Sequence, residues 1–376
     1  MAAILDPFRA QLDALAERSR LRRLAPRAGH DFASNDYLGF AHDPVIARAV
    51  AEAVARGVPV GSGGSRLLRG NAPEHEALEA RAAAIFGSEA ALFLANGFTA
   101  NGAILSALPG PGDLIVADAL IHASAHDGMR LSRAAHVLAA HNDAQAFDDA
   151  IRQWRAGGGT GRAWIVAETL YSMDGDRAPV DALAEVAARH EAMLVLDEAH
   201  ATAAHGPGGR GLAAHLEGLP HVVALHTCGK GLGVEGALVT AARPVIELLV
   251  NRGRGFVFST APSPLMAVAV QAALERMLMA DAQRAALAAL VDAAGRHICA
   301  PLGLAPPASQ ILPVVLGDDA RTMRVADALQ KAGFDIRGIR PPTVPRGTAR
   351  LRISLTLNVS AETVAALGAA LQAALA

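Results

Sequence analysis

The residue that says most about chemistry is a lysine in a chain that has almost none. Among the 34 lysines and arginines, only Lys230 and Lys331 are lysine. Arginine serves surface charge and ion pairs equally well, but its guanidinium stays protonated and cannot form an imine. Lys331 lies near the predicted end of an amphipathic helix, where a cation suits the helix dipole. Lys230 lies between Gly229 and Gly231 without such an explanation, so we expect it to be present for its amine chemistry.

Polar residues also follow three of the predicted buried strands. Asp197 ends one apolar run, and His200 follows it. Ser172 and Thr227 come shortly after two further apolar runs, and Thr227 precedes Lys230 by a few residues. In open α/β sheets, ligands bind at the carboxyl ends of the strands. We therefore expect these side chains to gather with Lys230 at one edge of a sheet.

These residue types match the needs of a pyridoxal phosphate (PLP) site. Such a site requires a lysine for the aldehyde and a carboxylate that keeps the pyridine nitrogen protonated. It also requires donors for the phosphate. Asp197 can supply the carboxylate, and Thr227 a phosphate donor close to Lys230. Gly97 and Phe98 precede a helix predicted from residue 99, so their backbone N–H groups can add to the phosphate site.

Each residue also has an ordinary structural interpretation. Asp197 alone could be a helix cap or turn residue. His122, which could stack on the cofactor ring, and His200 are two of 14 histidines and alone indicate little. The glycine-rich loop over 61–64 lacks both the ending of an ATP-binding loop and the context of a dinucleotide site. A Gly-x-Ser-x-Gly nucleophile elbow is absent from the sequence. It is the combination on successive strand ends that favours PLP.

Bulk composition narrows the class of protein. A chain of 376 residues that is 52% hydrophobic can bury more than one core, which predicts two domains. The net charge of −2 gives no basic excess for a nucleic-acid partner. Cys228 and Cys299 provide neither a disulfide framework nor a cysteine-rich metal site. The N-terminus does not look like a signal peptide, and no apolar run approaches the roughly 18 residues of a membrane span. We expect a soluble, cytoplasmic enzyme with no membrane partner.

The order of predicted elements indicates an α/β fold. Apolar runs predict strands over 90–94, 114–117, 163–167, 193–196 and 222–225, with helices between them. This alternation predicts a mostly parallel, doubly wound sheet. Helices are also predicted over 6–24, 44–56, 73–86 and 264–294, and the pattern restarts over 311–316, 320–332, 350–355 and from 361. We expect an N-terminal helix and loop over 1–40, a large PLP-binding domain over 41–270 and a small C-terminal α/β domain over 271–376.

Nearly end to end, the sequence resembles the α-oxoamine synthase family of fold-type-I PLP-dependent enzymes. The motifs that carry the resemblance are SNDYLG at 34–39, GSGGSR at 61–66, NGF at 96–98, HAS at 122–124, SMDGD at 172–176, DEAH at 197–200 and TCGKG at 227–231. One departure is Ala-Thr-Ala at 201–203, where the family usually has Gly-Thr-Gly. The resemblance implies the fold-type-I transferase fold, with a mostly parallel sheet flanked by helices.

The resemblance also implies roles around the cofactor. Lys230 would bind the PLP aldehyde, Asp197 would pair with the pyridine nitrogen, and His122 would stack over the ring. His200 and Ser172 would contact the phenolic oxygen or its surroundings. Lys230, Asp197, His122 and His200 are the expected catalytic residues.

Further residues would hold the phosphate. Gly97, Phe98 and Thr227 match the family's phosphate-binding positions. Ser259 and Thr260 match a stretch that reaches the phosphate of the neighbouring subunit. The resemblance therefore implies a homodimer with a shared active site.

Substrate binding is implied in the same way. Asn35 and Arg352 would bind the amino-acid carboxylate, with His122 nearby, and Arg22 and Thr343 would line the acyl-substrate entrance. The segment 339–352 is most similar to the branch that condenses L-alanine with a pimeloyl thioester, of coenzyme A or a carrier protein, in biotin biosynthesis. Two alternatives remain: a sister activity of the 5-aminolevulinate synthase or glycine C-acetyltransferase type, and a non-catalytic subunit of the same fold.

Overall fold

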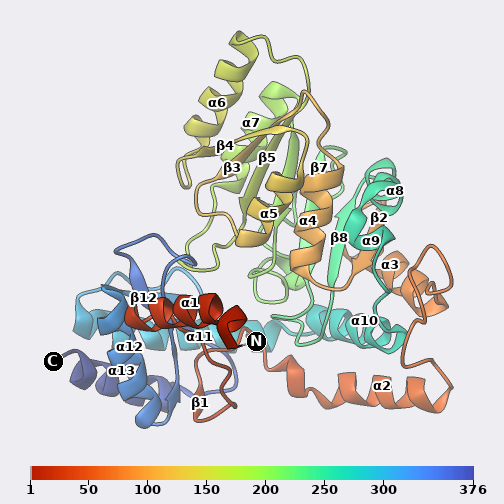
Figure 1. The fold of residues 1–376 in the computed structure, drawn as a ribbon. Coiled ribbons are helices and arrows are strands. Elements are labelled where there is room, and N and C mark those ends of the chain that lie inside the picture. Colours follow the sequence, from red (N-terminus) through yellow and green to blue (C-terminus); the bar gives the residue numbers. More distant parts are fainter. Residues whose placement is uncertain (1) are drawn as a thin grey trace. The chain divides into compact units, whose positions relative to one another are not determined.

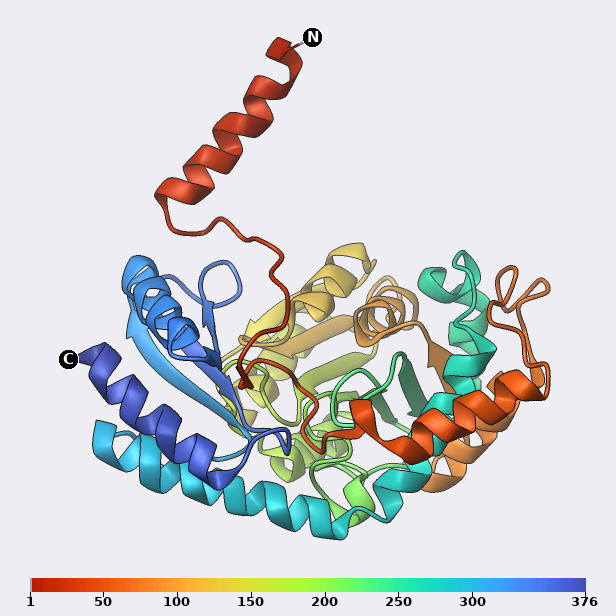
Figure 2. The same ribbon diagram turned by 90° about the horizontal axis from the view of Figure 1, so that it is seen from below.

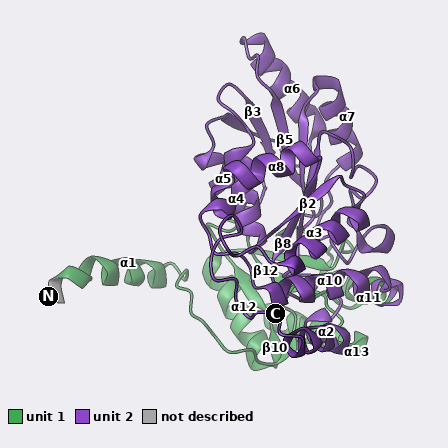
Figure 3. Cartoon of the chain, turned by 90° about the vertical axis from the view of Figure 1, so that its right-hand side faces the viewer, with its two compact units in different colours: residues 1–37, 173–175, 286–376 green, residues 38–172, 176–285 purple. Residues whose placement is uncertain are grey.

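The chain divides into two compact units. The structure is a computed structural model that describes residues 2–376. Unit 1 contains the chain up to Tyr37, the short segment Met173–Gly175, and Ala286–Ala376. Unit 2 contains Leu38–Ser172 and Asp176–Ala285 (Figure 3). Each unit is described by itself below.

Unit 2 is built around a seven-stranded sheet with the order β2-β8-β7-β6-β5-β3-β4 (Figure 1). β8 runs antiparallel to both β2 and β7, and the other four strand pairs are parallel, so the expected mostly parallel sheet is confirmed. The strands are β2 (Ala90–Leu94), β3 (Leu114–Asp118), β4 (Ala135–Ala139), β5 (Ala163–Glu168), β6 (Met193–Asp197), β7 (Val222–Thr227) and β8 (Ala237–Ala241). All residues of β5, β6 and β7 are buried, because helices cover both faces of this sheet.

The helices of unit 2 bury one apolar cluster on each face of the sheet. Ile104 of α4 and Met129 of α5 pack with alternate residues of the central strands. Phe147 of α6 and Leu183 of α7 pack with the residues between them, on the other face. The helices are α2 (Pro44–Ala55), α3 (Pro73–Phe86), α4 (Gly97–Ala107), α5 (Ala123–Leu131), α6 (Ala144–Ala156), α7 (Val180–His190), α8 (Arg243–Arg252), α9 (Arg254–Val257) and α10 (Pro264–Leu278), with 3-10 turns η2 (Phe40–His42) and η3 (Pro207–Gly209).

Unit 1 contains a three-stranded antiparallel sheet with the order β11-β12-β9 (Figure 2). The short strands β1 (His30–Asp31) and β10 (Phe334–Asp335) pair in parallel. The remaining elements are η1 (Ala2–Leu5), α1 (Asp6–Glu17), β9 (Ile311–Gly317), α12 (Asp319–Lys331), β11 (Arg337–Ile339), β12 (Ala349–Ser354) and α13 (Ala361–Leu375). Every residue of β12 is buried, including Arg350 and Arg352.

The segment Met173–Gly175 belongs to unit 1 because its contacts are there. Asp174 forms a 2.5 Å ion pair with Arg350. Gly175 has a φ of 71°, and a Cβ at this position would lie 2.1 Å from the carbonyl oxygen of Ile311. The Ser309 hydroxyl donates to the Gly175 carbonyl at 2.7 Å. A side chain at residue 175 would push this loop off β9, so glycine is required.

Two predicted helix boundaries were wrong. The first helix was expected to reach residue 24 but ends at Glu17. Ser19 adopts a φ of 55°, and the N–H of Arg20 turns back to the Leu15 carbonyl at 2.7 Å, which closes the helix end. Helix α4 was expected to begin at residue 99 but begins at Gly97, because Asn96 caps it.

The sequence analysis expected no segment long and apolar enough to span a membrane, but one helical run meets that criterion. Among the described residues, the run over 281–302, made of α11 (Asp281–Ala294), η4 (Gly295–Cys299) and η5 (Ala300–Leu302), is long and apolar enough to cross a bilayer by length and composition. Leu287, Leu290 and Ile298 are nevertheless buried. A Cβ on Gly368 of α13 would lie 2.1 Å from the His297 carbonyl oxygen, so α13 packs tightly on this run. One side of this run is therefore packed against α13.

Candidate active site

The ends of three adjacent strands bring carboxylates and a lysine to one edge of the unit 2 sheet. Glu168 ends β5 and lies opposite Asp197, which ends β6. Thr227 ends the next strand, β7, and the turn that follows carries Lys230. The register of parallel strands therefore places these residues together, as ligand-binding groups are placed in α/β sheets.

Lys230 and His200 are in direct contact. The lysine Nζ lies 2.9 Å from Nε2 of His200, which is 3% exposed. The turn is held close by Gly231, because a Cβ there would lie 2.5 Å from the Thr202 carbonyl oxygen. The imidazole thus orients the amine that the sequence indicated as reactive.

Asp197 is a buried carboxylate fixed by two donors. The backbone N–H of Ala199 donates to Oδ1 at 2.9 Å, and Nδ2 of Asn101 donates to Oδ2 at 2.7 Å. Asn101 lies on the buried face of α4 and also donates to Oγ of Ser124 at 3.0 Å. Hydrogen bonds to the charged form favour an ionised carboxylate. This is the property required of a group that holds a proton on a pyridine nitrogen.

Sequence reasoning did not find Asn101. An amide on the apolar face of a predicted helix was the only available signal, and many such residues have no functional role. Its importance comes from its contact with Asp197, which lies far away in the sequence.

His122 caps the N-terminus of α5 with a fixed ring. Its Nδ1 accepts a hydrogen bond from the backbone N–H of Ser124 at 3.2 Å and lies 2.8 Å from the Ser124 hydroxyl. Burial lowers the pKa of His122, and the positive charge of Lys230 lowers it further, against the opposing effect of Asp197. The imidazole is therefore neutral at pH 7, as suits a ring that stacks on an aromatic cofactor.

Glu168 is a second buried acid at this edge and was not among the expected site residues. Burial, and then the charge of Asp197, raise the pKa of Glu168 to about 8. Its Oε2 accepts from the backbone N–H of Ser172 at 3.1 Å, while Oε1 has no hydrogen-bond partner among the described residues. Glu168 therefore holds a proton at neutral pH.

A phosphate fits at the start of α4. Gly97 and Phe98 are its first residues, whose N–H groups have no partner within a helix. The Asn96 side chain accepts the N–H of Thr99 at 2.8 Å and so fixes the helix end. A Cβ on Gly97 would meet Oγ1 of Thr227 at 3.4 Å, so these two residues face each other. Backbone donors and a hydroxyl thus form a cradle suited to an anion.

Ser259 and Thr260 follow α9 and are exposed. The Ser259 hydroxyl donates to the carbonyl of Gly255 at 2.6 Å. Their expected contact with the phosphate of a neighbouring subunit stays a prediction.

Unit 1 brings the two expected carboxylate-binding residues together around a tyrosine. The Tyr37 hydroxyl lies 3.2 Å from Oδ1 of Asn35. Arg352 hydrogen-bonds to Tyr37, and its Nη1 donates to the Ser354 hydroxyl at 2.7 Å. Burial raises the pKa of Tyr37, so the phenol stays neutral. Tyr37 was missed as a site residue, although it lies in the SNDYLG motif.

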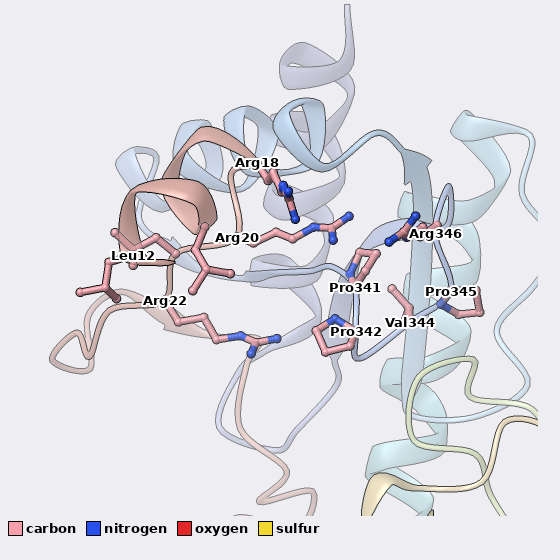
Figure 4. Close-up of a pocket in the computed structure, with 11 residues that line it drawn as sticks. Leu12, Arg18, Arg20, Arg22, Pro341, Pro342, Val344, Pro345 and Arg346 are labelled. Carbon is pink, nitrogen blue, oxygen red and sulfur yellow. The ribbon is translucent and has the colours of Figure 1, made fainter. Parts of the chain in front are cut away.

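The expected acyl-entrance residues also meet within unit 1. Nη2 of Arg22 donates to Oγ1 of Thr343 at 3.2 Å. Next to them is a cavity of about 580 Å³ between the end of α1 and the segment that follows β11 (Figure 4). The residues that line it are Leu12, Leu15, Arg18, Arg20, Leu21, Arg22, Pro341, Pro342, Val344, Pro345 and Arg346.

Both a protein-family model and individual curated proteins match this chain. The family model for aminotransferase class I and II matches residues 29–371. The chain belongs to this family. The chemistry of Lys230, the buried Asp197 and the anion cradle of unit 2 fits a PLP cofactor.

Individual relatives of the aminotransferase class I and II family match over almost the whole chain. The 8-amino-7-oxononanoate synthase of Anaeromyxobacter dehalogenans (strain 2CP-1 / ATCC BAA-258) is 44% identical and covers 99% of this chain and 96% of its own. That of Azoarcus sp. (strain BH72) is 40% identical, covering 95% and 94%. Serine palmitoyltransferase of Sphingomonas wittichii has a TM-score of 0.89 at 27% identity, covering 100% and 98%. The expected fold-type-I architecture and PLP cofactor are confirmed.

Proposed function

We propose that the protein catalyses the decarboxylative condensation of L-alanine with a pimeloyl thioester in biotin biosynthesis. The products are 8-amino-7-oxononanoate, CO2 and the free thiol. The observation that carries the proposal is the complete polar set around Lys230 in a chain that is 44% identical, over 99% of its length, to a relative named for this activity. The presence of Lys230, Asp197 and His122 disfavours a non-catalytic subunit. We also propose that the enzyme acts in the cytoplasm.

The bound cofactor supplies an electron-poor ring that accepts negative charge from the substrate α-carbon. Asp197, which accepts hydrogen bonds from Ala199 and Asn101, would hold the proton on the pyridine nitrogen. The amine of Lys230 would remove the α-proton of alanine as a general base. His200 keeps this amine in place through their 2.9 Å contact.

The remaining steps form one carbon–carbon bond and break one C–S and one carbon–carbon bond. The α-carbon bonds to the carbonyl carbon of the thioester, the C–S bond breaks, and the departing thiolate takes up a proton from solvent. The alanine carboxyl group then leaves as CO2, and Lys230 returns a proton to the α-carbon. His122, neutral at pH 7, polarises the new ketone by hydrogen bonding.

Substrate positioning is assigned to unit 1. We propose that Asn35 and Arg352 bind the alanine carboxylate, because the planar guanidinium can bind it with two parallel hydrogen bonds. Arg22 and Thr343, already 3.2 Å apart, would contact the acyl substrate. We further propose a homodimer in which Ser259 and Thr260 reach the partner's phosphate, as their exposure allows.

The first test is an absorption spectrum of the purified protein, followed by an assay of free thiol. We expect a visible band from bound PLP that L-alanine shifts, and thiol release only after pimeloyl-CoA is added. A response to glycine with a shorter acyl-CoA would instead support a sister activity. Absence of the band after PLP is added would overturn the proposal.

A further inference from the structure

The cavity between the end of α1 and the segment 341–346 is lined by positively charged side chains. Four of its eleven lining residues are arginine, and none of the described lining residues is acidic (Figure 4). In Figure 4 the guanidinium groups of Arg18, Arg20 and Arg346 gather on one side of the two prolines. Like charges that converge in a cavity with no acidic lining residue indicate a site for an anion.

Two of these arginines already have partners. Arg20 forms a 2.7 Å ion pair with Asp319, and Arg22 donates to Thr343. For Arg18 and Arg346, no side-chain hydrogen bond or ion pair exists among the described residues, and both are exposed. Arg18 and Arg346 are therefore the guanidinium groups whose donors are all available for a ligand.

Arg340 lies next to the cavity, and its pKa is affected by the same positive charges. It is 9% exposed and donates to the Ser19 carbonyl. Burial lowers the pKa of Arg340, and the nearby charges of Arg22 and Arg20 lower it further, despite Asp319. An anion in the cavity would relieve this repulsion. Arginine is also the side chain that best matches the geometry of phosphate oxygens.

The rest of the cavity is apolar. Leu12 and Leu15 of α1 are 51% and 42% exposed, and Leu21 and Val344 complete the apolar wall. A free phosphate ion has no apolar surface that could pack against this wall. A phosphate joined to an aliphatic arm uses both parts, and a cavity of about 580 Å³ is in the usual range for such ligands.

We propose that this cavity binds the 4′-phosphopantetheine arm of the acyl donor, with Arg18 and Arg346 on its phosphate and the leucines against its chain. The inference rests on the proposed function, since the arm enters as part of the thioester. It deepens that function by naming how the donor is held. Coenzyme A and a carrier protein present the same arm, so the site accepts either source.

The test compares two donors that differ only in this phosphate, pimeloyl-4′-phosphopantetheine and pimeloyl-pantetheine. In Arg18→Ala and Arg346→Ala, we expect KM for the phosphorylated donor to rise about 3- to 10-fold, because one exposed charge-assisted contact is lost. The double variant should show roughly the product of both effects. The KM for pimeloyl-pantetheine and kcat for both donors should stay unchanged, since the contact lies away from the reacting carbons.

Arg296→Ala is the matched control, because Arg296 is exposed on η4 of the same unit and does not line the cavity. It should leave both KM values unchanged. Equal changes for the two donors, or none for the phosphorylated one, would overturn the inference. Repeating the series with pimeloyl-CoA and a pimeloyl carrier protein should give parallel increases. An increase with pimeloyl-CoA alone would assign the arginines to its other phosphates and reject the shared arm.

A binding measurement separates this inference from the proposed function. Titration calorimetry with free coenzyme A should show binding that weakens about 10-fold or more in the double variant and is unchanged in Arg296→Ala. Equal affinity in all variants would overturn the inference, even in an active enzyme. If wild type condenses neither donor with alanine, the proposed function fails, whatever the calorimetry shows.

Discussion

The amide of Asn101 donates a 2.7 Å hydrogen bond to Oδ2 of Asp197. The bond connects α4, whose N-terminus contributes to the anion cradle, with the carboxylate expected to face the cofactor. It also uses the carboxylate oxygen that the backbone of Ala199 does not reach. Asn101 thereby stabilises the charged form of Asp197.

Replacing Asn101 with alanine should weaken PLP binding and lower kcat about 10-fold. A hydrogen bond to a buried charged group contributes about 1.5–3 kcal/mol. Spectrophotometric PLP titration and steady-state assays would measure both effects. Asn251→Ala is the control, because Asn251 is exposed and its amide donates to the backbone carbonyl of Glu247 on the same helix. Unchanged PLP affinity in Asn101→Ala would show that Asp197 does not depend on this donor.

Lys230→Ala should abolish turnover. The substitution removes the amine that binds the aldehyde and moves the α-proton, and no other lysine lies in unit 2. Product formation would be followed by mass spectrometry. Lys331→Ala, on α12, is the matched control and should keep wild-type activity. Appreciable product from Lys230→Ala would contradict the assignment.

Glu168→Gln should make stability less sensitive to alkaline pH. The pKa of Glu168 is raised from 4.5 to about 8 in the folded protein, so the folded state holds this proton more tightly than the unfolded state. Wild type should therefore lose stability as pH rises from about 4.5 through 8. Glutamine has no proton to lose, so the variant should lose at least about 1 kcal/mol less over this range.

Urea unfolding at pH 5 and pH 8.5 would measure this difference. Glu247→Gln serves as the control, because Glu247 is exposed on α8. If Glu168→Gln and wild type lose the same stability between these pH values, Glu168 does not hold a proton in the folded protein.

Arg352→Lys should raise KM for L-alanine about 10-fold or more with a smaller effect on KM for the acyl donor. Lysine keeps the charge but cannot form two parallel hydrogen bonds to a carboxylate. Arg337→Lys is a close control, because Arg337 lies opposite Arg352 on β11 and pairs with Asp335. Equal KM values for alanine in wild type and Arg352→Lys would remove Arg352 from the carboxylate site.

Local patterns predicted much of this molecule. Buried strands are continuous apolar runs, so the strands that end at Asp197 and Thr227 were visible without a structure. The scarcity of lysine singled out Lys230. The end of the first helix was misplaced because Ser19 takes a left-handed conformation that its residue type does not announce.

The sequence by itself determined the parallel sheet, the PLP chemistry and the residues most directly tied to it, because each depends on neighbouring residues or on a motif. Only the tertiary structure decided that Glu168 holds a proton and that Asn101 donates to Asp197. Strand pairing sets Glu168 beside Asp197, and Asn101 reaches Asp197 from another element. The placement of Arg18 and Arg346 in the lining of one cavity also depends on tertiary structure, because the two residues are far apart in the sequence. Burial and Coulomb interactions depend on distance in space, which sequence separation does not reveal.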